Sequence, residues 1–238
     1  MKILFTYPPI DTKKGTPLLS QNRQFQYFKE PTYIYPVVPA YAVSLLKKNG
    51  FDVLWKDCIA EKVKENKFYE FLNEEKPSLI VIETKTPVVK QHWNIISEIK
   101  KRFPVVKVAL CGDHVTALPL ESMQNSEVDF ILTGGDYDFL LLNLCSVIKN
   151  SETFNNLEPG IYFRDNGQIQ NSGNFILNHD LDELPLIDRE LSNWKLYAYK
   201  NGNFKKTPGT YIMAGRDCWW GKCKFCSWPT LYPKYRTR

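Results

Sequence analysis

Apolar runs alternate with amphipathic segments along the first 150 residues of the chain. Short apolar runs predict buried strands, and apolar residues three or four positions apart predict helices. The predicted strands are 2–7, 51–55, 79–82, 105–110 and 128–132, and the predicted helices are 39–49, 139–148 and two around Phe68–Leu72 and Trp93–Lys100. Five strands that alternate with helices predict an α/β fold with a doubly wound parallel sheet.

Ligands of such sheets bind at the carboxyl ends of the strands, beside the point where the strand order reverses. The residues expected there are Pro8, Pro9, Glu83, Thr84, Gly112, Asp113, His114, Thr116, Gly134 and Gly135. Glycines at this edge allow the backbone to approach a flat or bulky ligand. The first strand lacks the G-x-G-x-x-G pattern, which argues against a nicotinamide site.

The three histidines of the chain differ in their settings. His114 follows a strand beside Gly112 and is either a cofactor contact or a loop residue with local hydrogen bonds. His92 and His179 have no such setting, so we expect them at the surface.

The segments after residue 150 predict irregular structure with a few short elements. Residues 158–170 predict a hairpin with its turn at Asp165-Asn166-Gly167, because Asn-Gly favours tight turns. Residues 181–188 read as a connector, and 211–216 as a further strand. The polar stretch 11–32 is expected to be a long loop.

Three cysteines, Cys218, Cys223 and Cys226, fall within nine residues. Thiolates are strong ligands for iron, and three of them on a four-iron cluster leave one iron open to a substrate or cofactor. A zinc site would need a fourth ligand nearby, and a redox C-x-x-C pair would leave Cys218 unexplained. The other cysteines, at positions 58, 111 and 145, are expected in the core.

The cysteine stretch resembles the cluster loop of radical S-adenosylmethionine (SAM) enzymes, whose pattern is C-x-x-x-C-x-x-C. Phe225 matches the aromatic residue that lies against the adenine of SAM in that family. One extra residue stands between Cys218 and Cys223, as in a variant of members that also carry a cobalamin-binding domain. The resemblance implies a 4Fe–4S cluster on the three cysteines and SAM as a cofactor.

Residues 112–119 and 129–138 are similar to two loops of the cobalamin-binding domains fused to radical SAM enzymes. Gly135 stands where Glu is usual. The D-x-H-x-x-G signature is absent, so the resemblance implies a flavodoxin-like domain that binds cobalamin without a protein histidine on the cobalt.

Only twelve residues follow Cys226, whereas a radical SAM partial barrel needs on the order of 200. We therefore expect a cobalamin-binding-like domain at 1–150, a hairpin and linker at 151–207, and the start of a radical SAM domain at 208–238. The implied function is the front part of an enzyme for radical methyl transfer or related C–H chemistry, inactive alone. The alternatives are a cobalamin-binding module and a zinc-stabilised α/β domain.

Charge and composition add the expected surroundings. Residues 1–6 contain no signal-peptide core and no apolar run reaches membrane-spanning length, so the expected location is the cytoplasm. Residues 195–238 hold ten Lys or Arg and one acid, whereas the remainder has 21 basic and 25 acidic residues. This basic tail fits anionic groups of small cofactors better than nucleic acid. The expected partners are a small-molecule substrate and an electron-donor protein.

Overall fold

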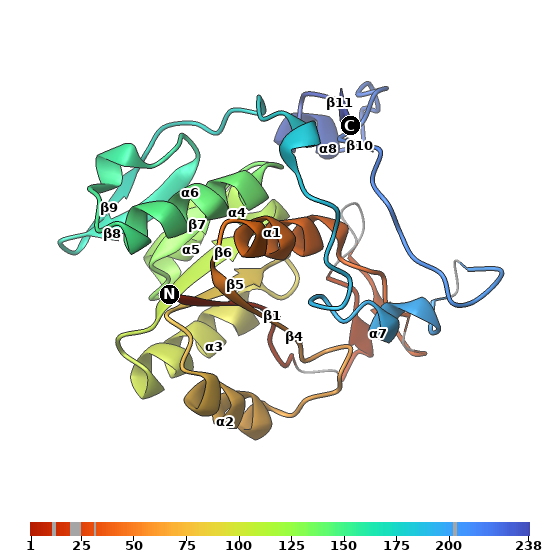
Figure 1. Cartoon of the computed structure of the whole chain (residues 1–238), viewed down its shortest axis with the longest axis horizontal. Coiled ribbons are helices and arrows are strands. Elements are labelled where there is room, and N and C mark those ends of the chain that lie inside the picture. Colours follow the sequence, from red (N-terminus) through yellow and green to blue (C-terminus); the bar gives the residue numbers. More distant parts are fainter. Residues whose placement is uncertain (11–12, 20–24, 31, 202–203) are drawn as a thin grey trace.

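The computed structural model describes residues 1–10, 13–19, 25–30, 32–201 and 204–238. Its central element is a seven-stranded sheet in the order β4-β1-β5-β6-β7-β8-β9 (Figure 1). The first five strands run parallel, and β8 and β9 are antiparallel to their neighbours. The strands are β1 (Lys2–Tyr7), β4 (Asp52–Asp57), β5 (Leu79–Glu83), β6 (Lys107–Cys111), β7 (Phe130–Leu132), β8 (Ile161–Asp165) and β9 (Gln168–Asn171).

Successive residues of the parallel strands enter different hydrophobic cores, as the two-residue repeat of a strand requires. Ile3 and Phe5 of β1 belong to one core and Leu4 to the other, and β5 alternates in the same way. Because both faces are covered, the central strands β1, β5 and β6 are apolar along most of their length.

Helices cover both faces of the sheet (Figure 1). Apolar residues of α1 and α6 pack in one core, and those of α2, α3 and α5 pack in the other. The helices are α1 (Val37–Lys48), α2 (Glu65–Glu75), α3 (Val89–Arg102), α4 (Asp113–Ala117), α5 (Pro119–Asn125), α6 (Tyr137–Lys149), α7 (Lys195–Ala198) and α8 (Trp228–Leu231). Among the described residues, no helix has the length and apolar character needed to cross a membrane.

The predicted parallel sheet is confirmed, but the number of strands differs. The sheet has seven strands rather than five, because the hairpin predicted at 158–170 adds β8 to the free edge of β7. The stretch after β6, expected as a loop, forms the short helices α4 and α5. Part of the long loop expected at 11–32 lies outside the described residues, and the rest contains two-residue strands β2 (Thr16–Pro17) and β3 (Tyr27–Phe28).

The connector after the hairpin runs along α1. Leu181 and Leu184 pack against Tyr41 and Leu45 of that helix. Asp188 Oδ2 forms an ion pair with Lys47 Nζ at 2.6 Å. These contacts attach the connector to the sheet domain and lead the chain back toward the carboxyl ends of the strands.

The C-terminal segment, defined here as residues 213–238, contains α8 and a small ladder. β10 (Gly215–Arg216) pairs antiparallel with β11 (Arg236–Thr237). The strand predicted at 211–216 therefore exists only at its last two residues, where the returning chain supplies a hydrogen-bonding neighbour. Figure 1 shows α8, β10 and β11 together beside the α4 end of the sheet.

Candidate functional site

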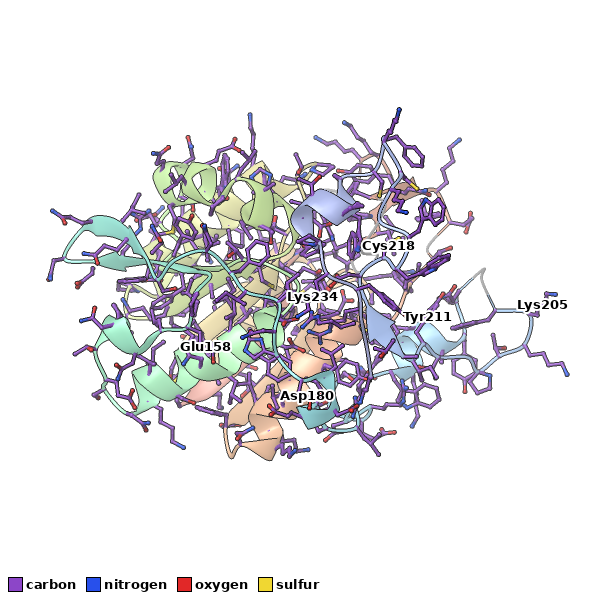
Figure 2. The ribbon with its side chains drawn as sticks, turned by 90° about the horizontal axis from the view of Figure 1, so that it is seen from above. Glu158, Asp180, Lys205, Tyr211, Cys218 and Lys234 are labelled. Carbon is purple, nitrogen blue, oxygen red and sulfur yellow. The ribbon has the colours of Figure 1, made fainter. Side chains whose placement is uncertain are left out.

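A cavity of about 140 Å³ lies at the carboxyl edge of the parallel strands. The sheet domain provides one wall and the C-terminal segment provides the other. Its lining residues are Val38, Glu83, Gly112, Asp113, Gly135, Tyr137, Met213, Gly215, Arg216, Asp217, Trp228 and Tyr232. Figure 2 shows Cys218 and Lys234 of the C-terminal segment over the body of the molecule, whereas Lys205 projects outward from another loop.

Glu83 ends β5, next to β1 at the point where the strand order reverses. Its carboxylate accepts a short hydrogen bond from the hydroxyl of Tyr7, the last residue of β1. Both side chains are buried, and burial raises the pKa of Glu83 and that of Tyr7 above their usual values. The pair therefore places a buried carboxyl group with weakened acidity against the cavity.

Asp113 continues this polar cluster toward the C-terminal segment. Lys85 Nζ lies 2.5 Å from Asp113 Oδ2 and 4.0 Å from Glu83 Oε1. Tyr232 donates its hydroxyl hydrogen to Asp113 Oδ1 at 2.8 Å. A continuous row of polar side chains, Tyr7-Glu83-Lys85-Asp113-Tyr232, thus crosses the carboxyl edge and ends on the C-terminal segment.

The three glycines at this edge have different structural roles. A Cβ atom on Gly112, whose φ is +108°, would lie 2.5 Å from the Thr84 carbonyl oxygen. A Cβ atom on Gly134 would meet the Phe175 ring at 2.7 Å. Gly112 and Gly135 line the cavity, and a Cβ atom on Gly135 would lie 3.2 Å from the Tyr232 ring. Gly112 and Gly134 are therefore required by packing within the protein, and Gly135 leaves room at the cavity.

His114 lies behind the cavity wall rather than on it. Its side chain is buried, its Nδ1 lies 3.2 Å from Thr86 Oγ1, and its ring meets that of Trp93 edge-on. Burial lowers its pKa, so the imidazole is neutral near pH 7. Of the two alternatives for His114, this geometry supports a residue that forms local hydrogen bonds.

Thr84 and His92 form a buried pair under the same edge. Thr84 Oγ1 lies 2.8 Å from His92 Nδ1, and both residues are fully buried. The expectation that His92 lies at the surface was wrong, because the first turn of α3 faces the sheet. Burial lowers the pKa of His92 to about 3, which keeps it neutral.

Thr116 joins two of the loops that the sequence analysis singled out. Its hydroxyl donates to the Gly112 carbonyl at 2.9 Å and accepts from the Gly134 N–H at 3.0 Å. Pro8 and Pro9 follow β1 and do not line this cavity. Pro9 lines a different cavity, of about 620 Å³, beside Tyr33 and Ile59.

Two arginines of the C-terminal segment pair with two aspartates after β7. Arg216 contacts both oxygens of Asp138, one at 2.9 Å, and Arg236 binds both oxygens of Asp136 at 2.5 and 2.6 Å. Although burial opposes ionisation, hydrogen bonds from His179 and Arg236 hold the pKa of Asp136 well below its usual value. These cations of the basic tail therefore neutralise acids of the sheet domain and do not present a free anion site.

His179 adds a third cation to this group. Its Nδ1 lies 3.0 Å from Asp136 Oδ2 and its Nε2 lies 2.8 Å from Glu158 Oε2, while its ring stacks on Phe139. Burial alone would lower its pKa, but the hydrogen bonds to Asp136 and Glu158 outweigh it and raise the pKa to about 9. The expectation of a surface histidine was wrong, because the side chain is only 18% exposed.

The three cysteines of the candidate cluster loop are half-buried, and none forms a disulfide. Cys226 donates its backbone N–H to the Cys223 carbonyl at 3.1 Å, which closes a turn between these two residues. Within the described residues, no group of three or more Cys, His, Asp or Glu side chains is gathered as a metal site. The donor chemistry fits an iron–sulfur cluster, and the loop has to rearrange to bring three thiolates together.

Aromatic residues of the same loop face the solvent. Phe225 is 93% exposed, and Trp219 and Trp220 are also exposed. The Phe225 side chain is thus accessible to a ligand bound at the loop.

Several residues of the site were missed by the sequence analysis. Lys85 directly follows Glu83 and Thr84, and its charge within a strand-end motif was the available signal. Tyr7 ends an apolar strand, and the sequence does not distinguish it from an ordinary aromatic residue of the core. Tyr137 and Tyr232 carry no local pattern that marks them, because only the fold brings them to the cavity.

Searches among known proteins give structural relatives. No family model matches the chain. The solved structure of the cobalamin-dependent SAM radical enzyme OxsB, with aqua-cobalamin and SAM bound, aligns with 99% of this chain at a TM-score of 0.74 and 14% identity. The radical SAM methyltransferase TsrM from Kitasatospora setae, with cobalamin and a 4Fe–4S cluster bound, aligns with the whole chain at a TM-score of 0.64 and 16% identity.

A curated relative gives a sequence match as well. An uncharacterized methyltransferase of Pyrococcus horikoshii is 21% identical over 192 residues, which cover 81% of this chain. The chain spans 40% of that relative, 29% of OxsB and 43% of TsrM. It therefore shares the fold of a part of these proteins.

Proposed function

We propose that this chain is the N-terminal portion of a cobalamin-dependent radical SAM enzyme. The likeness to OxsB and TsrM supports the proposal, because it extends over the sheet domain, the connector and the cysteine loop in one alignment. Both neighbours are described with cobalamin bound, and the curated relative is a methyltransferase. Radical methyl transfer, or related C–H functionalisation, to a small molecule is the proposed outcome for the whole protein, with a separate protein as the electron donor.

The proposed cobalamin site is the carboxyl edge of the sheet around Glu83, Asp113 and Gly135. Parallel sheets of this strand order bind ligands at that edge. His114 does not line the cavity, so we assign it no contact with cobalamin. Cobalamin, when bound, would supply a transferable methyl group, and the protein would supply position and exclusion of water.

The proposed cluster ligands are Cys218, Cys223 and Cys226, with Phe225 placed to contact the adenine of SAM. A cluster with an open iron, when bound, would supply the electron that cleaves SAM. The exposed position of Phe225 and the half-buried cysteines leave this loop accessible to both groups.

The size of the cavity bears on how cobalamin would enter. Pockets for drug-sized ligands have volumes of about 300–1,000 Å³, whereas this cavity has about 140 Å³. It admits one peripheral group and not a macrocycle. Binding of the corrin ring therefore requires residues 228–232 to move away from Gly135.

The test is anaerobic reconstitution of the chain with iron and sulfide, followed by analysis of iron, sulfide and zinc. About four irons and four sulfides per chain are expected. A Cys223→Ala variant should lose the cluster, whereas a Cys145→Ala variant, which changes a buried core thiol, should retain it. Stoichiometric zinc without sulfide would refute the cluster and favour the zinc-stabilised alternative.

Cobalamin binding is measured separately, by retention of hydroxocobalamin after gel filtration. Retention without the cluster would support the cobalamin-binding module alone. Loss of both groups would overturn the proposal.

A further inference from the structure

The small ladder of the C-terminal segment brings two arginines side by side. Arg216 of β10 and Arg236 of β11 are directly opposite each other in the antiparallel register. Like charges at opposite positions of a ladder destabilise it, and a ladder with two residues in each strand has few hydrogen bonds to offset this repulsion. The ladder is therefore stabilised by anions that lie beside it.

Two aspartates of the sheet domain supply these anions. Asp138 contacts Arg216 through both of its oxygens. Asp136 binds Arg236 at 2.5 and 2.6 Å and Arg216 at 3.2 Å. All of these side chains are at most 10% exposed, so salt screens their charges only weakly. Because paired hydrogen bonds between arginine and carboxylate fix orientation as well as distance, they hold the ladder in one place on the sheet domain.

The two aspartates belong to the loop that borders the carboxyl edge of the sheet. Asp136 is the N-cap residue of α6 and Asp138 lies in the first turn of that helix, where the helix dipole favours negative charge. Gly135 and Tyr137, their neighbours in the chain, line the cavity. One loop of the sheet domain thus forms part of the proposed cobalamin site and also holds the ladder.

The two strands of the ladder enclose the proposed cluster loop. Arg216 comes just before the first cysteine of that loop, and Arg236 follows α8. Two parts of the segment have to move when the proposed groups bind: residues 218–226, which must gather three thiolates, and residues 228–232, which must admit the corrin ring. Both arginines lie outside these parts. Their contacts with the aspartates can therefore persist while the chain between them rearranges.

We propose that Arg216 and Arg236, held by Asp138 and Asp136, are positioning residues that fix the cluster loop relative to the carboxyl edge of the sheet. The proposal rests on the proposed function for the identity of the two groups, cluster and cobalamin, whose separation is set in this way. The anchoring itself follows from the contacts of these side chains. Loss of an anchor should therefore leave both groups bound and change the separation between them.

The test measures this separation in the 238-residue chain loaded with both groups. Cob(II)alamin and a reduced four-iron cluster are both paramagnetic, and pulsed EPR reports the dipolar coupling between them. Arg236→Gln leaves Asp136 paired with Arg216 and His179. This variant should retain both groups in the parent's stoichiometry but lose the parent's defined coupling. Arg236→Lys, which keeps the cation, should recover most of it.

Further variants separate positioning from stability. A loss of stability alone would not alter the coupling, because the coupling is measured only in molecules that hold both groups. Asp138→Asn weakens the other anchor and should also change the coupling, and if this variant fails to fold, Arg236→Gln decides. Lys234→Gln changes an exposed cation of the same segment and should leave the coupling as in the parent. A parent without a defined coupling, or a parent-like coupling in the anchor variants, would overturn the proposal.

A measurement on the unloaded chain distinguishes failure of this proposal from failure of the proposed function. If the parent retains neither group, the proposed function fails, and hydrogen exchange of the unloaded chain tests the anchors. Amides of residues 214–216 and 236–238 should exchange at least about tenfold faster in Arg236→Gln than in the parent, because hydrogen bonds between charged groups are lost. Amides of β5 and β6 should exchange at the parent's rate, which excludes a general loss of stability. Equal exchange of the ladder amides in the two proteins would overturn the anchoring role.

Discussion

The Tyr232 hydroxyl donates to Asp113 Oδ1 at 2.8 Å and joins the end of α8 to the first turn of α4, 119 positions earlier in the chain. The same ring also lies beside Gly135, where an added Cβ atom would be 3.2 Å from it. Tyr232 therefore closes the carboxyl edge of the sheet, and burial raises the pKa of its hydroxyl well above the usual value.

Tyr232→Phe should loosen this closure. The loss of one buried hydrogen bond costs about 1 kcal/mol, so amides of residues 228–232 should exchange hydrogen faster while the sheet stays protected. Association of hydroxocobalamin should also become faster in stopped-flow measurements if residues 228–232 must move. Tyr235→Phe, a change in the same segment at an exposed ring, serves as the control. Equal exchange rates in both variants would show that the Asp113 contact does not hold the segment.

The ion pair between Arg216 and Asp138 should be among the most sensitive in the chain. Asp138 is fully buried and Arg216 nearly so. Asp138→Asn leaves the buried Arg216 guanidinium with Asp136, at 3.2 Å, in place of two carboxylates, and breaking a buried ion pair costs about 3–5 kcal/mol. Urea unfolding should report this loss. Glu70→Gln, which breaks the exposed ion pair with Lys67, should cause no measurable change; similar losses in the two variants would contradict the assigned roles.

His179 should make the stability of the protein depend on pH in the alkaline range. Its folded pKa of about 9 lies above the ordinary value of about 6.5. The protonated form is therefore favoured by folding, and its contribution is complete below pH 6.5 and is lost as the pH rises through 9. After allowance for solvent screening, the loss amounts to about 2 kcal/mol.

The measurement is the free energy of unfolding at pH 6.5 and at pH 9.5, for the parent chain and for His179→Gln. The parent should lose stability over this interval by more than the variant does, because the glutamine does not titrate. An equal change in the two proteins would exclude His179 as the source.

Gly112→Ala should be far more damaging than a similar change elsewhere. At Gly112 the backbone conformation is one that only glycine adopts readily, and a Cβ atom would lie 2.5 Å from the Thr84 carbonyl oxygen. A loss of about 3 kcal/mol is expected from the strain and the clash together. Gly50→Ala also has a positive φ but has no atom within 4 Å of the new Cβ, and should cost about 1 kcal/mol. Thermal unfolding of both variants decides whether the clash or the backbone strain dominates.

The sequence alone determined the parallel part of the sheet and much of the site edge. The apolar strands and the helical spacing carry this information locally, because a strand buried on both faces must be apolar throughout. The ends of those strands meet at one edge for geometric reasons, so the sequence places Glu83, Asp113 and Gly135 together, and all three line the cavity. The spacing of Cys218, Cys223 and Cys226 can likewise be read from the sequence alone.

Only the tertiary structure decided which of these side chains face the cavity and what pairs with them. A residue at a strand end is placed by the strand, but its side-chain direction depends on the packing around it, and His114 and Thr84 turn inward for that reason. Tyr232, Arg216 and Arg236 reach Asp113, Asp138 and Asp136 across about 80–120 positions of sequence. Local patterns contain no signal for such contacts, because they arise when the chain folds back and the buried charges find partners.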